Sequence, residues 1–196
     1  QLHGATKEKL TPELLERLTE MRAQGLYRYL GVNTHDSRVI QYIASVPGLC
    51  DMVLIDYNVL QLDREPLIHQ LAQANVGVVA GTILAQGHIV TTKVGSVRSG
   101  SFFWYLARAL LKPSARRLVA SSAAMRRVLG SIPGMTASQA AFAYILANLQ
   151  VSSCVFGTTK LVNLHDALGA VDIDLDVASR NAIQEAFAAL PEPISV

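Results

Sequence analysis

The most chemically suggestive stretch of the sequence is Gly157-Thr158-Thr159-Lys160, which follows the apolar run VSSCVF and precedes LVNLHDALGAV. If the run is a buried strand and the next segment a helix, the turn between them offers free backbone N–H groups, two hydroxyls and one cation. These are the groups that bind a phosphate. Glycine and threonine also occur at such turns simply as helix caps. The turn alone therefore predicts either a phosphate site or a capped helix start.

A long part of the chain carries no acidic residue, because none lies between Glu65 and Asp166. The same interval contains the basic residues Lys93, Arg98, Arg108, Lys112, Arg116, Arg117, Arg126, Arg127 and Lys160. This stretch creates a positive potential that favours an anionic partner. A solvated basic surface and a phosphate-bearing small ligand are both compatible with it. Nucleic acid is not predicted as a partner, because no aromatic–basic interleaving or nucleic-acid-reading motif accompanies the charge.

The elements that must position these residues repeat along the chain. The pairs Gly31-Val32, Ile55-Asp56 and Val79-Ala80 recur at intervals of 24 residues. A strand–helix repeat with short loops builds a parallel sheet, and so short and regular a spacing favours a (β/α) barrel. We therefore predict an α/β fold, a partial (β/α)8 TIM barrel with about four parallel strands, alternating helices and a C-terminal helix. Residues 1–196 are predicted to form a single domain.

The predicted strands lie near residues 27–32, 51–57, 76–80 and 151–156, parallel and adjacent in that order, with the end of a further strand at residues 1–3. Helices are predicted at 12–24, 37–45, 64–75, 102–111, 115–130, 137–149, 161–171 and 177–190, and a long loop at 88–101. Ligands of a barrel bind where its strands end at their carboxyl sides. The candidate site is therefore expected in the turns that follow the strands.

The sequence also indicates a compartment. Residues 1–20 are charged throughout and show no signal peptide, and no apolar run reaches the roughly 18–20 residues of a membrane helix. Cys50 and Cys154 lie in or beside apolar segments and suit buried thiols in a reducing compartment. The predicted location is the cytoplasm, with no membrane partner.

Several motifs, in their order and spacing, resemble the aldo-keto reductases. They are LHG at residues 2–4, YRYLGVNTH at 27–35, DMVLIDYNVL at 51–60, GVVAGTILAQG at 77–87 and ASQAAFAYILANLQVSSCVFGTTKLVNL at 137–164. Members of this family are (β/α)8 barrels that bind NADP(H) in an extended form and reduce carbonyl groups. The resemblance implies that the chain begins at the end of the family's fourth strand and that the N-terminal part is missing.

The resemblance also implies roles for residues of the first strand ends. His3 falls where the family places the active-site histidine that hydrogen-bonds the substrate carbonyl. Asn33 and Thr34 match the Ser-Asn pair that holds the nicotinamide carboxamide. Leu54 stands where many members have a glutamine for the same amide, and Gly81 replaces the tyrosine that often stacks on the nicotinamide. Sugar-dehydrogenase-like members show the same leucine and glycine, which suggests a subgroup.

Further cofactor residues follow from the resemblance. Thr82, Leu84 and Gly87 match the loop that covers the pyrophosphate. Gly157, Thr158, Thr159 and Lys160 match the turn at the adenosine 2′-phosphate. Asn163 stands where an arginine often grips that phosphate, and Asp166 lies at the adenine. The implied cofactor is NADP(H), with NAD(H) left open because few cations remain for the 2′-phosphate.

The implied function is an NAD(P)H-dependent oxidoreductase that acts on a small-molecule carbonyl or alcohol. The family's Asp, proton-donating Tyr and Lys have no counterpart in the chain, so the chain alone is predicted to lack hydride-transfer activity. A catalytically inactive nucleotide-binding or interaction module, in which two copies could pair their sheet edges, is the alternative. An unrelated phosphate-binding (β/α) barrel is a third interpretation. No histidine spacing predicts a metal site, and His35 is expected either to cap a helix or to act in catalysis.

Overall fold

A computed structural model describes residues 1–87, 89 and 113–190. Two compact units make up the chain. Unit 1 contains residues Gln1–Asp56, Asp63–Gly81 and Asn148–Val155, and unit 2 contains Tyr57–Leu62, Thr82–Ala147 and Phe156–Val196. Each unit is described by itself below. The predicted helix at 102–111 and most of the loop predicted at 88–101 lie outside the described residues.

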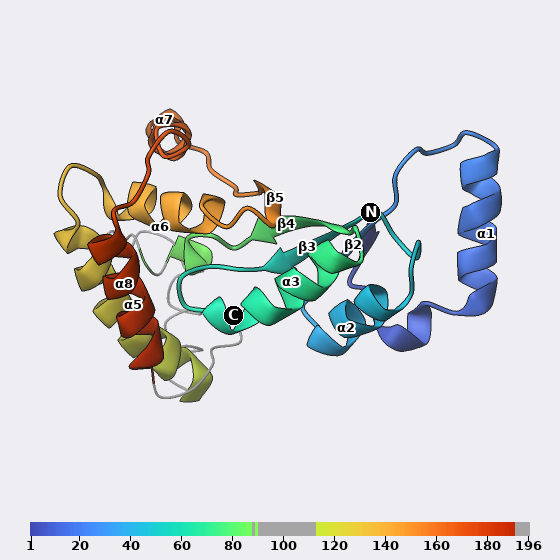
Figure 1. Cartoon of the computed structure of the whole chain (residues 1–196), viewed down its shortest axis with the longest axis horizontal. Helices are drawn as coiled ribbons and strands as arrows, with labels where there is room; N and C mark the ends of the chain where they lie inside the picture. Colours follow the sequence, from blue (N-terminus) through green and yellow to red (C-terminus); the bar gives the residue numbers. More distant parts are fainter. Residues whose placement is uncertain (88, 90–112, 191–196) are drawn as a thin grey trace, which may run out of the picture. The chain divides into compact units, whose positions relative to one another are not determined.

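Unit 1 is built on a five-stranded parallel sheet in which the strands follow one another in sequence order (Figure 1). The strands are β1 (Leu2–His3), β2 (Gly31–Asn33), β3 (Met52–Asp56), β4 (Gly77–Gly81) and β5 (Val151–Cys154). This order confirms the predicted α/β class and the predicted adjacency of the four strands and the strand end at residues 1–3.

The second strand is shorter than predicted, because residues 27–30 lie outside it. The backbone N–H of Leu30 donates to the Asp51 carboxylate at 2.7 Å and so does not extend the ladder. Tyr29 is 72% exposed and lacks the burial that stabilises a strand position. The aromatic and apolar residues of this stretch are typical of a strand, which is why the sequence predicts a strand longer than the one observed.

The two faces of the unit 1 sheet differ in burial. Side chains that are in register on parallel strands project to the same face. One face carries the fully buried residues Val32, Val53, Ile55, Val78 and Ala80. The opposite face carries Asn33 and Leu54, which pair in register and are both half-buried. The same face carries Val79 and Asp56, which are buried, so it is partly open at Asn33 and Leu54 and closed at Asp56.

Three helices belong to unit 1: α1 (Pro12–Ala23), α2 (Ser37–Ser45) and α3 (Glu65–Gln73). Helix α1 begins as predicted, with the Thr11 hydroxyl accepting a hydrogen bond from the N–H of Leu14 at 3.3 Å. Helices α2 and α3 pack against each other, and α3 also packs against β4. Their buried apolar residues are Val39, Ile40, Ile43, Ile68 and Leu71. This packing forms the core of the unit.

Unit 2 is helical in its described part. Its helices are α5 (Pro113–Ser131), α6 (Ala137–Leu146), α7 (Leu161–Leu168) and α8 (Val177–Ala188), with a short 3-10 turn, η3 (Ala85–Gly87), after β4. Helix α5 packs against α6 and α8, and α6 packs against α7. The predicted helices 115–130, 137–149, 161–171 and 177–190 are confirmed within three residues at each end. Phe142 of α6 is 1% exposed and meets Phe156 edge to face, with ring centroids 5.1 Å apart.

Candidate functional site

The carboxyl edge of the unit 1 sheet carries three predicted site residues, His3, Asn33 and Gly81, and the neighbouring Asp56. His3 ends β1 and pairs in register with Asn33 at the end of β2, while Asp56 ends β3 and pairs with Gly81 at the end of β4. Because the strands are parallel, all these ends lie on one edge of the sheet. His3 is exposed, whereas Asp56 is only 2% exposed.

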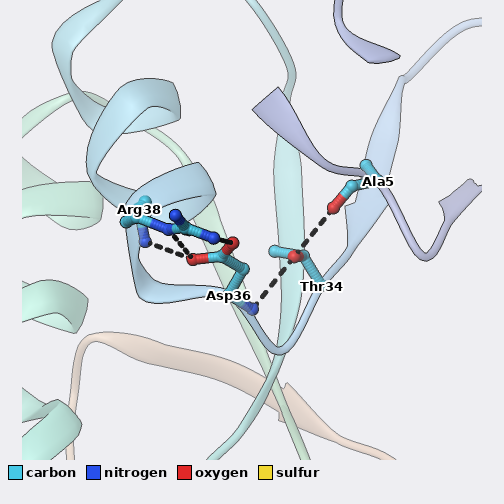
Figure 2. A network of polar contacts seen from close by, with 4 residues as sticks. All are labelled: Ala5, Thr34, Asp36 and Arg38. Atoms are coloured by element: carbon cyan, nitrogen blue, oxygen red, sulfur yellow. Dashed lines mark hydrogen bonds and ion pairs between the residues drawn. The ribbon is translucent and has the colours of Figure 1, made fainter. Parts of the chain in front are cut away.

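Thr34, a predicted nicotinamide residue, belongs to an internal hydrogen-bond network (Figure 2). Its hydroxyl donates to the carbonyl oxygen of Ala5 at 3.1 Å and accepts from the backbone N–H of Asp36 at 3.2 Å. Its own backbone N–H donates to the Leu54 carbonyl at 3.2 Å. The residue is 2% exposed. These bonds give Thr34 a structural function: it ties the turn after β2 to the segment after β1.

Asn33 is the neighbour that remains available to a ligand. It is half-buried on the more open face of the sheet, and its carboxamide has no hydrogen-bond partner within the described part of the chain. A primary amide offers two N–H donors and a carbonyl acceptor. Of the predicted pair, Asn33 can therefore contact a cofactor amide directly, while Thr34 holds the turn that presents it.

Helix α2 starts at this turn, and its cap is Asp36. The Asp36 carboxylate accepts from the backbone N–H of Arg38 at 2.9 Å and pairs with the Arg38 guanidinium at 2.7 Å (Figure 2). Bonding to the Arg38 side chain, and then to its backbone N–H, lowers the pKa of Asp36 below its usual value. Since Asp36 caps the helix, the capping alternative for His35 is wrong, and the catalytic alternative stays a prediction.

The two departures from the family pattern, Leu54 and Gly81, lie against each other. A Cβ atom built on Gly81 would come within 3.1 Å of Leu54 Cδ2 and 3.4 Å of the Ile55 carbonyl oxygen. A larger residue at 81 would require the leucine side chain to move. The leucine and the glycine are therefore sterically linked in this chain.

The predicted pyrophosphate loop in unit 2 is a tight turn. Thr82 has a positive φ of 52°, which is a strained conformation for a β-branched residue. Its carbonyl accepts from the Ala85 N–H at 2.7 Å, and its hydroxyl lies 3.3 Å from the amide nitrogen of the buried Asn58. The Gly87 N–H donates to the Leu84 carbonyl at 2.8 Å, and Gly87 adopts a φ of 87° that favours glycine.

In the turn before α7, some groups stabilise the helix start and others remain available to a ligand. The Thr158 hydroxyl accepts from the Lys160 N–H and from the Asn163 amide, each at 3.1 Å, and lies 3.3 Å from the Lys160 carbonyl. Thr158 and Asn163 thus stabilise the helix start. The Lys160 and Thr159 side chains are exposed, and neither has a hydrogen-bond or ion-pair partner in the described residues. Gly157 leaves open space around its Cα. The available groups are thus one cation and one hydroxyl beside a helix N-terminus.

Asp166, predicted at the adenine, joins two helices of unit 2. Its carboxylate oxygens lie 2.9 and 3.0 Å from the Thr136 hydroxyl, which donates to them. The same hydroxyl accepts from the Gln139 N–H, and the Gln139 side chain accepts from the Thr136 N–H, so Thr136 forms a capping box at the start of α6. Asp166 therefore has a structural partner, and its adenine contact stays a prediction.

Replacing Thr136 with alanine is expected to lower the free energy of unfolding by about 1–2 kcal/mol, because it removes a helix cap and leaves the Asp166 carboxylate without its donor. Urea denaturation followed by circular dichroism measures the loss. Thr11→Ala is the matched control, since the Thr11 side chain bonds only within its own helix start, to the Leu14 N–H and the Glu13 carboxylate, and does not join two helices. A loss no larger than that of the control would contradict the contribution of Asp166.

The structure brings together the side chains of His35 and Asp56, a contact that the sequence analysis does not predict. The His35 Nδ1 atom hydrogen-bonds the Asp56 carboxylate, and the side chain of Asp56 is 3% exposed whereas that of His35 is 64% exposed. His35 lies just after β2 and Asp56 ends β3, so the two residues occupy similar places in successive strand–helix repeats. This similarity is the only signal that sequence inspection could have used.

No group of three or more His, Cys, Asp or Glu residues in the described ranges could hold a metal ion. Within the same ranges, no helix is both long and apolar enough to cross a membrane.

Comparison with known proteins identifies the family. A model of the aldo/keto reductase family matches residues 1–188. The uncharacterized oxidoreductase YqkF of Bacillus subtilis is 24% identical over 172 residues, which are 88% of this chain and 54% of YqkF.

Solved structures show the same fold. The holo form of the aldo-keto reductase AKR11C1 from Bacillus halodurans has a TM-score of 0.73 at 20% identity and covers 95% of this chain and 59% of that one. The glycerol dehydrogenase AKR11B4 from Gluconobacter oxydans has a TM-score of 0.71 at 18% identity, with 98% and 59% covered. The chain thus spans little more than half the length of these proteins. Its predicted starting point within the barrel is not confirmed by the matches and stays a prediction. The match over nearly all of its residues shows that the chain belongs to the aldo/keto reductase family.

Proposed function

We propose that the protein is an oxidoreductase that uses a nicotinamide dinucleotide to interconvert a small-molecule carbonyl and its alcohol. The observation that carries this proposal is the family match over residues 1–188. The site residues add chemical support, because groups that suit an amide and groups that suit a phosphate are both available in the described residues. Asn33 in unit 1 offers a free carboxamide, and the turn 157–160 in unit 2 offers a cation and a helix N-terminus.

Within this proposal, His3 is the residue that contacts the substrate. It ends β1, is exposed and lies in register with Asn33. An imidazole can donate a hydrogen bond to a carbonyl oxygen and so polarise it. The cofactor is proposed to be NADP(H), with NAD(H) as the alternative. The cytoplasmic location, the single-domain organisation and the possible homo-oligomer remain predictions.

The direct test of the proposal is isothermal titration calorimetry of the 196-residue chain with NADPH and, separately, with NADH. Saturable binding of either cofactor supports the nicotinamide site. No binding of either, by a chain whose circular dichroism shows it to be folded, would contradict the proposal for this chain and favour the interaction module.

Lys160→Ala is expected to weaken NADPH binding by about tenfold or more and to leave NADH binding nearly unchanged. The reason is that only NADPH carries the extra phosphate, and a charge-assisted hydrogen bond contributes about 1.5–3 kcal/mol when well formed. The loss should shrink as salt rises, since an exposed ion pair is screened.

Arg127→Ala is the matched control for this prediction. It removes one exposed positive charge from α5 in the same unit, and among the described residues its side chain bonds only the Ala123 carbonyl of its own helix. Equal losses of NADH and NADPH affinity on Lys160→Ala would mean that the lysine serves the helix start instead of the 2′-phosphate. No loss at all would make the turn a helix cap with a solvated lysine.

A further inference from the structure

The His35–Asp56 pair at the carboxyl edge of unit 1 holds an imidazole in one tautomer. A carboxylate only accepts hydrogen bonds, so the proton on the imidazole must lie on Nδ1, which donates to Asp56. In the neutral ring, Nε2 is then an acceptor. Nothing in the described chain hydrogen-bonds Nε2, and the His35 side chain is 64% exposed. A fixed, oriented acceptor is therefore presented at this edge.

His35 and Asn33 project to the same side of the sheet. The Thr34 N–H donates to the Leu54 carbonyl, which continues the ladder beyond the last residue of β2. Side chains alternate along such an extended segment, so residues 33 and 35 share a face. Asp56 lies two residues beyond Leu54, the register partner of Asn33, and so it is on that face as well. The contact between His35 and Asp56 agrees with this placement.

We propose that His35 is a cofactor-binding residue whose Nε2 accepts a hydrogen bond from the amino group of the nicotinamide carboxamide. Asn33 supplies the complementary donor to the carbonyl of the same group. This inference rests on the proposed function. The complementarity is chemical: a primary amide needs both an acceptor and a donor, and His35 and Asn33 together offer them. Leu54, which lies beside Asn33 in the sheet, offers neither. The Asp56 carboxylate on this face already accepts from His35, so the proposal assigns the amino group to His35 Nε2 and the carbonyl to the donor of Asn33.

Other residues already cap α2 and hold the turn at His35, so these structural functions do not require the histidine. Asp36 caps α2, and the Thr34 hydroxyl and N–H hold the turn to Ala5 and Leu54. The bond to Asp56 leaves the second ring nitrogen without a partner among residues 1–87, 89 and 113–190. This unused atom, rather than the bond to Asp56, is what the proposal assigns to the ligand.

The test compares two cofactors that differ only in the group concerned. NADP⁺ carries the carboxamide, whereas its 3-acetylpyridine analogue carries a methyl in place of the amino group and cannot donate. His35→Asn keeps an N–H near the Nδ1 position for Asp56 and removes Nε2. Wild type is expected to bind NADP⁺ about 3- to 10-fold more tightly than the analogue, since one neutral hydrogen bond contributes about that much.

In His35→Asn, NADP⁺ affinity should fall by the same factor of about 3 to 10 while the analogue is unaffected, so that the two affinities become equal. His69→Asn is the matched control, because His69 is an exposed histidine of unit 1 bonded to glutamines. The control should keep the wild-type preference.

Three results would overturn the inference. If His35→Asn keeps the wild-type preference for NADP⁺, Nε2 does not bind the amino group. If His35→Ala weakens both cofactors equally while His35→Asn binds like wild type, the histidine acts only through Asp56. If wild type binds NADP⁺ and the analogue equally, the carboxamide is not bound at this edge. Only a failure of wild type to bind either compound removes the proposed function as well.

Discussion

Replacing Phe142 with alanine is expected to lower the free energy of unfolding by about 3–5 kcal/mol. Phe142 is 1% exposed on α6, where the helix is buried along most of its length. The substitution removes the apolar contacts of a whole ring and leaves a cavity that the surrounding helices fill only in part. It also removes the edge-to-face contact with Phe156, and such aromatic pairs add about 0.5–1.5 kcal/mol.

Chemical denaturation with urea, followed by circular dichroism, measures this loss as a shift of the midpoint at constant slope. Leu168→Ala is the control in the same unit, because Leu168 is 58% exposed on α7 and should cost less than about 0.5 kcal/mol. A Phe142→Ala variant as stable as the Leu168→Ala variant would contradict the described packing of α6.

The second large effect is expected in unit 1, where Leu71→Ala should lower the free energy of unfolding by about 2–5 kcal/mol. Leu71 is fully buried on α3, the helix that packs against both α2 and β4. Removing its side chain opens a cavity in the core of the unit. The magnitude depends on how far α2 and β4 can close around the smaller residue.

Leu26→Ala is the control for Leu71→Ala, since Leu26 belongs to the same unit and is 63% exposed. The same urea titration measures both variants. A loss below 1 kcal/mol for Leu71→Ala, or one equal to that of the control, would contradict the packing of α3. If unfolding shows two transitions, Phe142→Ala and Leu71→Ala should each shift a different one.

The sheet was predictable from the sequence because local patterns determine it. The interval of 24 residues between strand ends such as Ile55-Asp56 and Val79-Ala80 requires a strand and a helix in each repeat, and parallel pairing follows from the crossovers. The helix starts at Thr11 and Thr136 were also predictable, since a capping hydroxyl acts on an N–H only three residues away. The length of β2 was not, because it depends on Asp51, which is distant in sequence.

The partners of the candidate site residues could not be predicted in the same way. Thr34 and Ala5 are 29 residues apart, Thr136 and Asp166 are 30 apart, and His35 and Asp56 are 21 apart. Each contact depends on strand register or helix packing, which a one-dimensional pattern does not contain. The family resemblance named residues for the cofactor, but it could not say which hydroxyls and carboxylates the fold itself already uses.

The alkylation rate of the buried Cys50 thiol can report how often the core of unit 1 opens. Cys50 is 5% exposed, and burial raises the pKa of its thiol to about 11. At pH 8 only about one thiol in a thousand is then ionised, and the reactive thiolate is shielded from reagents. Alkylation of Cys50 must therefore wait for unit 1 to open. Cys154 on β5 is less buried, and burial raises its pKa as well. The ratio of the two alkylation rates, followed by mass spectrometry, would time the opening of the core without any probe being added to the chain.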